Sequence, residues 1–108
     1  MNTVNWLVDT NSVFYFQGQQ AKCHKILGIQ GFGILIVQIT EILGNKTIGK
    51  SEDAQLRNLI RQAMIIPVSE EIAYRTADQI QRYGMKGIDS LIAATAIEYD
   101  LTLVSADK

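Results

Sequence analysis

Cysteine, histidine and proline are nearly absent from this sequence of 108 residues, which contains one of each. A single cysteine, Cys23, cannot form an internal disulfide, and it excludes the cysteine clusters that bind zinc. The neighbouring His24 adds no zinc-ligand spacing to it. No apolar run approaches the roughly 20 residues of a membrane-spanning helix, and residues 1–6 lack the Lys or Arg of a secretory signal. We therefore expect a cytoplasmic protein without membrane association.

An excess of either charge is also missing, because ten Lys and Arg face eleven Asp and Glu, for a net charge of −1. This balance excludes a strongly basic nucleic-acid binder, although it allows a local basic face. Hydrophobic residues make up 47% and charged residues 19% of the chain, which excludes disorder. The length predicts a single domain over residues 1–108.

Short apolar runs alternate with stretches of helical spacing along the chain. The runs predict strands over residues 4–8, 34–37, 64–68 and 101–105. The helical stretches cover residues 11–16, 19–27 and 40–45 and three segments that follow Ser51, Ser69 and Gly87. Strands that are almost continuously apolar and are separated by helices indicate a parallel sheet covered on both faces. The pattern therefore predicts an α/β fold.

Helix boundaries can be predicted from local residue types. Ser51 and Ser69 each stand before two acidic residues, so both are expected to be N-caps. Gly84 and Gly87 mark the exit from the helix that begins at Ser69. That helix is expected to bury the stripe formed by Ile72, Ala73, Thr76, Ala77, Ile80 and Tyr83.

Four acidic residues stand at the ends of predicted elements. Asp9 follows the first strand, Asp107 follows the last, and Glu41 and Asp89 lie near the starts of helices. Ligands of open α/β sheets bind beyond the carboxyl ends of the strands, where these acids can converge. Converging carboxylates repel each other unless a cation lies between them. Oxygen-only ligands suit Mg²⁺ or Mn²⁺, and such a site can hydrolyse a phosphodiester.

The sequence around these acids resembles PIN-domain nucleases, and most closely the VapC-type toxins of toxin–antitoxin pairs. The similarity is carried in chain order by the segments 7–11 (LVDTN), 39–43 (ITEIL), 87–96 (GIDSLIAATA) and 101–107 (LTLVSAD). The resemblance implies a PIN-like three-layer α/β/α sandwich with a central, mostly parallel sheet. It also implies a metal-dependent endoribonuclease that hydrolyses RNA phosphodiester bonds.

Residue roles follow from the resemblance. The catalytic and metal-binding acids would be Asp9, Glu41, Asp89 and Asp107, holding Mg²⁺ or Mn²⁺. Asn11 and Ser105 match positions whose polar side chains orient the acids or a metal-bound water. The implied partners are a VapB-type antitoxin and a second copy of the chain. Apolar residues 13–16 are an expected source of surface for that homodimer.

Other features qualify this interpretation. Lys86 and Arg82 precede Asp89 and are the expected RNA-binding cations. The chain stops one residue after Asp107, where family members continue through another strand, so we expect a C-terminally truncated member. The alternative is a catalytically silent PIN-like module that binds an antitoxin or itself. A magnesium phosphatase is a further possibility, but Asn11 stands where its second aspartate belongs.

Overall fold

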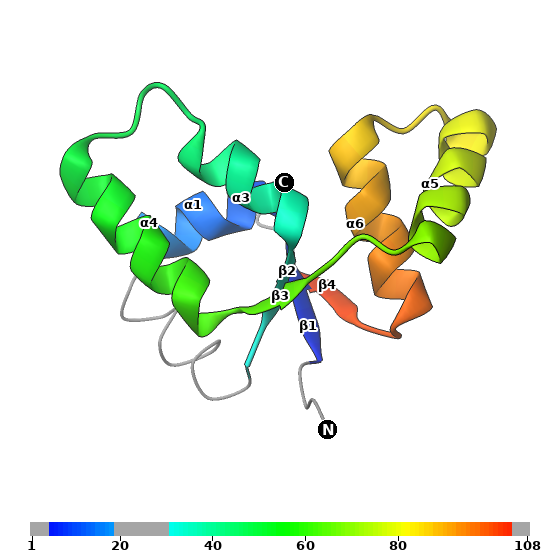
Figure 1. Ribbon diagram of the computed structural model, residues 1–108, viewed down its shortest axis with the longest axis horizontal. Coiled ribbons are helices and arrows are strands. Elements are labelled where there is room, and N and C mark those ends of the chain that lie inside the picture. Colours follow the sequence, from blue (N-terminus) through cyan, green and yellow to red (C-terminus); the bar gives the residue numbers. More distant parts are fainter. Residues whose placement is uncertain (1–4, 19–30, 105–108) are drawn as a thin grey trace.

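The computed structural model describes residues 5–18 and 31–104, with the side chains of residues 16–18 left aside (Figure 1). The elements in chain order are β1 (Trp6–Val8), α1 (Thr10–Gly18), β2 (Gly33–Leu35), α3 (Ile36–Leu43), α4 (Lys50–Gln62), β3 (Met64–Ile66), α5 (Glu70–Tyr83), α6 (Gly87–Glu98) and β4 (Thr102–Val104). The helix predicted over residues 19–27, with Cys23 and His24, lies outside the described residues, as do Ser105 and Asp107.

A four-stranded parallel sheet in the order β3-β2-β1-β4 forms the central layer. Helices α1, α3 and α4 lie on one side of it, and α5 and α6 lie on the other (Figure 1). The chain adds strands in one direction from β1 to β3 and then crosses back to β4. Since crossovers between parallel strands are right-handed, this reversal moves the last two helices to the opposite face. The predicted α/β/α sandwich is confirmed.

Two apolar layers hold the helices against the sheet. Val8 and Ile34 face α1, α3 and α4, where they pack with Val13, Ile42 and Leu56. Leu7 and Leu35, their immediate neighbours along the strands, face the other side and pack with Ile66 and Ile92. Successive side chains in a strand point to opposite faces, so a strand covered on both sides has to be apolar throughout. This explains why β1 and β2 carry no polar side chain.

The apolar run over residues 34–37 does not form one strand. Strand β2 ends at Leu35, and Ile36 and Val37 already belong to helix α3, which begins four residues before the predicted start. The backbone N–H of Leu35 donates to Gln38 Oε1 over 2.7 Å and thereby satisfies one of the free N–H groups at the start of the helix. A glutamine three residues into a helix is a known partner for the N-cap backbone.

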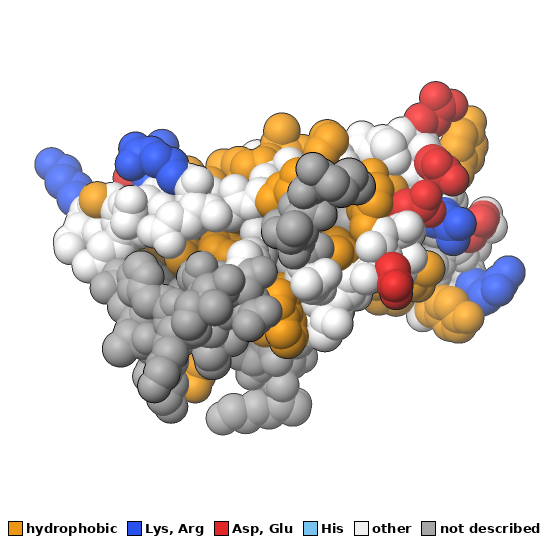
Figure 2. Space-filling view, turned by 90° about the horizontal axis from the view of Figure 1, so that it is seen from below, with side chains coloured by type: hydrophobic (Ala, Val, Ile, Leu, Met, Phe, Trp, Pro, Cys, Tyr) orange, Lys and Arg blue, Asp and Glu red, His pale blue; other side chains and the backbone are white. Residues whose placement is uncertain are grey.

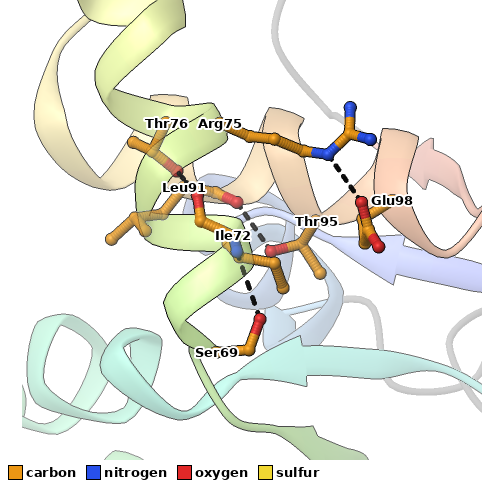
Figure 3. A network of polar contacts seen from close by, with 7 residues as sticks. All are labelled: Ser69, Ile72, Arg75, Thr76, Leu91, Thr95 and Glu98. Carbon is orange, nitrogen blue, oxygen red and sulfur yellow. Dashed lines mark hydrogen bonds and ion pairs between the residues drawn. The ribbon is translucent and has the colours of Figure 1, made fainter.

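Helices α4 and α5 begin with different caps. In α5 the N–H of Ile72 donates to Ser69 Oγ over 3.1 Å (Figure 3), which confirms the predicted N-cap. In α4 the N-cap is Gly49, whose N–H donates to Glu52 Oε1 over 3.2 Å. The prediction for Ser51 is therefore wrong, because Ser51 lies inside the first turn.

Helix α5, on the second face of the sheet, is less buried than predicted. Ile72 and Thr76 of α5 are buried against α6, but Ile80 and Tyr83 are 41% and 68% exposed. The Arg75 Nε lies 2.6 Å from Glu98 Oε1 and links the two helices (Figure 3). Gly84 ends α5 with φ = 67°, a conformation that glycine adopts without strain. The other predicted exit residue, Gly87, instead begins α6.

The Ser69→Ala substitution should lower the free energy of unfolding by about 1 kcal/mol, because the Ile72 N–H loses its acceptor. Urea denaturation followed by circular dichroism measures this change. Ser51→Ala is the matched control, and it should cause no loss, since Ser51 caps nothing and alanine favours the helix interior. Equal losses in the two variants would contradict this assignment of the caps.

Candidate functional site

Asp9 links the end of β1 to the start of α1. Its backbone N–H donates to the Val104 carbonyl over 3.2 Å, and its own carbonyl accepts from the Val13 N–H over 3.1 Å. Its Oδ1 accepts the N–H of Ser12 over 2.8 Å. Asp9 is therefore the N-cap of α1, and this bond fixes its half-buried carboxylate at the carboxyl end of the central strand.

The end of β4 lies beside Asp9. The Val104 carbonyl accepts both the Asp9 N–H and the Ser12 hydroxyl, each over 3.2 Å. The sheet order reverses between β1 and β4, and such a switch point is where parallel sheets bind ligands. Asp107, three residues after Val104, lies outside the described residues, and so does Ser105. Their predicted roles remain predictions.

Glu41 reaches the same edge of the sheet from α3. Its Oε1 accepts the hydroxyl hydrogen of Thr10 over 2.6 Å, although the two residues are 31 positions apart. Thr10 directly follows Asp9 in the chain, so this bond brings Glu41 to the first turn of α1. This short contact holds Glu41 against the residue that follows Asp9, so these two predicted acids lie at the same edge of the sheet.

Gln38 lies beneath this contact and is fully buried. Its Nε2 donates to the Val8 carbonyl over 2.9 Å and lies 3.4 Å from Thr10 Oγ1. Neither Gln38 nor Thr10 stands out in the sequence as part of the site. The only signal is one amide within the apolar run from Ile34 to Ile39, since a buried polar group requires partners.

Asp89 occupies the third position of α6. Helix α6 is joined to β4 by a short turn, and its N-terminal end lies on the side of the sheet to which the strands point (Figure 1). The Asp89 side chain is exposed, and within residues 5–18 and 31–104 no hydrogen bond or ion pair holds it. Asp89 is therefore at the expected edge, but the structure records no contact between it and Asp9 or Glu41.

The predicted polar and basic residues lie on the surface around this edge. Asn11 is exposed at the second position of α1. Lys86 is the exposed N-cap of α6, and Arg82 is exposed in the last turn of α5. These two cations flank the connection that leads to Asp89. In the view from below, acidic side chains gather at the α5 and α6 end, whereas Lys and Arg are present at both ends of the molecule (Figure 2).

The donor atoms available at the edge are oxygens, which suit a hard divalent cation. Among the described residues, the backbone donates a hydrogen bond to only one of the two Asp9 carboxylate oxygens. The Glu41 side chain is exposed at the same edge. Within the described ranges, however, no three Asp, Glu, His or Cys side chains lie close enough to hold a metal ion. The donor chemistry fits Mg²⁺ or Mn²⁺, and Asp9 and Glu41 are the described side chains at this edge that could contribute ligands to such an ion.

In this class of proteins, the parallel α/β/α sandwiches, ligands bind at the carboxyl edge of the sheet where the strand order reverses. Asp9 and Glu41 of this chain lie at that edge. The sequence matches the PIN domain family over residues 6–108. The chain belongs to the PIN-domain family, as its acidic motifs predict. A comparison with curated proteins gave no match.

Solved structures of similar fold include three toxin–antitoxin assemblies. A chain of a toxin–antitoxin complex from Klebsiella pneumoniae is 25% identical, with a TM-score of 0.72 over 94% of this chain and 85% of its own. A chain of VapBC2 from Rickettsia felis, bound to a promoter DNA fragment, is 17% identical, with a TM-score of 0.76 over 94% and 86%. A chain of DNA-bound VapBC from Salmonella typhimurium is 14% identical, with a TM-score of 0.71 over 91% and 83%.

The cap formed by Asp9 predicts a difference between two substitutions. Asp9→Ala removes the acceptor of the Ser12 N–H and should lower the free energy of unfolding by about 1 kcal/mol. Asp9→Asn keeps an oxygen at the same place and should retain most of the stability. Thermal and urea denaturation of both variants measure the difference, and an equal loss would show that the cap does not act through the side-chain oxygen.

Proposed function

We propose that this protein is a Mg²⁺- or Mn²⁺-dependent endoribonuclease, the toxin component of a VapBC-type toxin–antitoxin pair. Membership of the PIN-domain family, whose members are generally nucleases, supports a hydrolase that acts on phosphodiester bonds. The observation that carries the proposal is the bond from Thr10 to Glu41. That bond holds Glu41 against Thr10, the residue next to Asp9, at the carboxyl end of β1, where the fold would bind a ligand.

In this proposal Asp9, Glu41, Asp89 and Asp107 hold the metal. A bound Mg²⁺ or Mn²⁺ would polarise the phosphoryl oxygen and lower the pKa of a water molecule. The protein orients the carboxylates: Ser12 holds Asp9 through its backbone N–H, and Thr10 holds Glu41 through its hydroxyl. Their fixed positions reduce the ordering that a metal or substrate would otherwise require.

The remaining predicted residues have supporting roles. Asn11 and Ser105 would orient the acids or a water molecule by hydrogen bonds. Lys86 and Arg82, which are exposed beside the start of α6, would neutralise RNA phosphates on the approach to Asp89. With a net charge of −1, most of the affinity for RNA would have to come from such local contacts.

The partners of this toxin would be a VapB-type antitoxin and a second copy of the chain. The antitoxin is supported by the likeness to chains of toxin–antitoxin complexes. Such a toxin would act on RNA in the cytoplasm; no described helix is long and apolar enough to cross a membrane. Of the expected dimer residues 13–16, Val13 is buried and Phe14 packs against the core, whereas Tyr15 is 50% exposed. The exposed apolar side chains include Tyr74, Ile80, Tyr83 and Ile97 on α5 and α6.

The Asp89→Asn substitution should reduce the rate of RNA cleavage at least about 100-fold. This loss should exceed the one caused by removing a residue that only orients a metal ligand, because Asp89 is proposed to bind the metal itself. A mixed structured RNA is incubated with the purified chain, once with Mn²⁺ and once with EDTA. Wild-type cleavage should require the metal. Asp100→Asn, at the other end of α6, is the matched control and should cleave normally, since Asp100 has φ = 54°, which asparagine tolerates.

Two results would contradict the proposed function. Cleavage by Asp89→Asn at the wild-type rate would remove Asp89 from the site. An absence of both cleavage and Mn²⁺ binding by the wild-type chain would favour the alternative, a catalytically silent module that binds an antitoxin or itself.

The homodimer has its own test. Light scattering at micromolar concentration should give twice the 12.0 kDa mass of one chain. Ile80→Lys and Ile97→Lys, which place charge on the exposed apolar surface of α5 and α6, should shift the mass towards that of the monomer. A wild-type monomer under these conditions would remove the dimer from the account.

A further inference from the structure

Gln38 makes more hydrogen bonds than the start of α3 requires. Its Oε1 accepts the Leu35 N–H over 2.7 Å, which is enough to cap the helix. Its Nε2 carries two hydrogens, one of which is donated to the Val8 carbonyl over 2.9 Å. The same nitrogen lies 3.4 Å from Thr10 Oγ1, so the second hydrogen is available to the hydroxyl. One buried amide thus joins the end of β1, the start of α3 and the start of α1.

The chemistry of these groups gives the chain of bonds a direction. An amide nitrogen can only donate, so Thr10 Oγ1 is the acceptor towards Gln38. The hydroxyl has one hydrogen, and the 2.6 Å bond to Glu41 Oε1 uses it. A carboxylate can only accept, which fits this polarity. The sequence of donors therefore runs from Gln38 through Thr10 to Glu41, from a fully buried group to an exposed one.

We propose that Gln38 is a positioning residue for the metal site, acting on Glu41 through the Thr10 hydroxyl. The inference rests on the proposed function and adds a buried residue that has no contact with substrate or metal. Gln38 holds Thr10 Oγ1 in place, and Thr10 holds one oxygen of Glu41 at the carboxyl edge. Glu41 lies on α3 and is exposed. Without the hydrogen bonds from Gln38 to Thr10 and from Thr10 to Glu41, its flexible side chain would lose its fixed direction before the metal binds.

A purely structural role for Gln38 would depend on the Val8 and Leu35 backbone bonds alone. The proposed role depends on the third contact, to Thr10. Substitutions at Thr10 separate the two, because they leave both backbone bonds of Gln38 intact. Partners that orient metal ligands typically contribute about 10- to 100-fold to metal affinity.

The first arm measures Mn²⁺ affinity by calorimetry in the absence of RNA. Thr10→Val, which keeps the shape and removes the hydroxyl, should weaken binding at least about tenfold. Thr10→Ser, which restores a hydroxyl, should recover most of that loss. Thr40→Val is the matched control: it removes the hydroxyl that bonds to the Val37 carbonyl, one residue before Glu41, and should leave Mn²⁺ affinity unchanged. Unchanged affinity in Thr10→Val would overturn the proposal.

The second arm is a double-mutant cycle with Gln38→Glu. A carboxylate at this position cannot donate to Thr10 and instead competes with Glu41 for its hydroxyl hydrogen. Gln38→Glu should therefore weaken Mn²⁺ binding about tenfold more in the wild-type background than in the Thr10→Val background. Effects that bypass Thr10, including the added charge, occur in both backgrounds and cancel. Equal changes in the two backgrounds would overturn the proposal.

A third readout needs no substitution at Gln38. The side-chain amide signals of Gln38 in the NMR spectrum of the metal-free protein should shift in Thr10→Val and stay in place in Thr40→Val. Unshifted signals in Thr10→Val would contradict the contact even if Gln38→Glu does not fold. The two failures can be told apart: a wild-type chain that neither binds Mn²⁺ nor cleaves RNA refutes the proposed function, whereas normal Mn²⁺ binding by Thr10→Val refutes only this inference.

Discussion

The carboxyl end of β1 is joined by hydrogen bonds to three other elements. The Val8 carbonyl accepts from Gln38 of α3, the Asp9 N–H donates to the end of β4, and the first turn of α1 donates to Asp9. Because β1 pairs with both β2 and β4, a displacement of this strand end would leave several buried polar groups without partners. Such groups are costly to leave unpaired. The positions of Asp9 and Glu41 depend on this constraint.

Much of the fold could be predicted because β1 and β2 are covered on both faces and therefore had to be apolar. The edge that carries Asp9 could be predicted as well, since a parallel sheet has one carboxyl edge and one switch point. The cap at Ser69 was evident from a serine followed by two acids. These features depend on the local sequence or on general rules of topology, so they can be predicted from the sequence alone.

The sequence did not reveal features that depend on tertiary contact. The Gln38 amide bonds to a carbonyl 30 residues away, so nothing local distinguishes it from an exposed glutamine. Ser51 resembled Ser69 as a cap, but the chain turns two residues earlier, at Gly49. Ile80 and Tyr83 have the spacing of a buried stripe, yet α5 lies at the outside of the sandwich and only part of that stripe meets α6.

The central claim is that carboxylates from separate elements share one divalent cation at this edge. The most direct measurement is the anomalous scattering of Mn²⁺ in crystals of the protein. The account predicts a peak about 2.1 Å from carboxylate oxygens of Asp9 and Glu41. A Mn²⁺ ion bound only elsewhere on the protein, or no peak at saturating Mn²⁺, would contradict it.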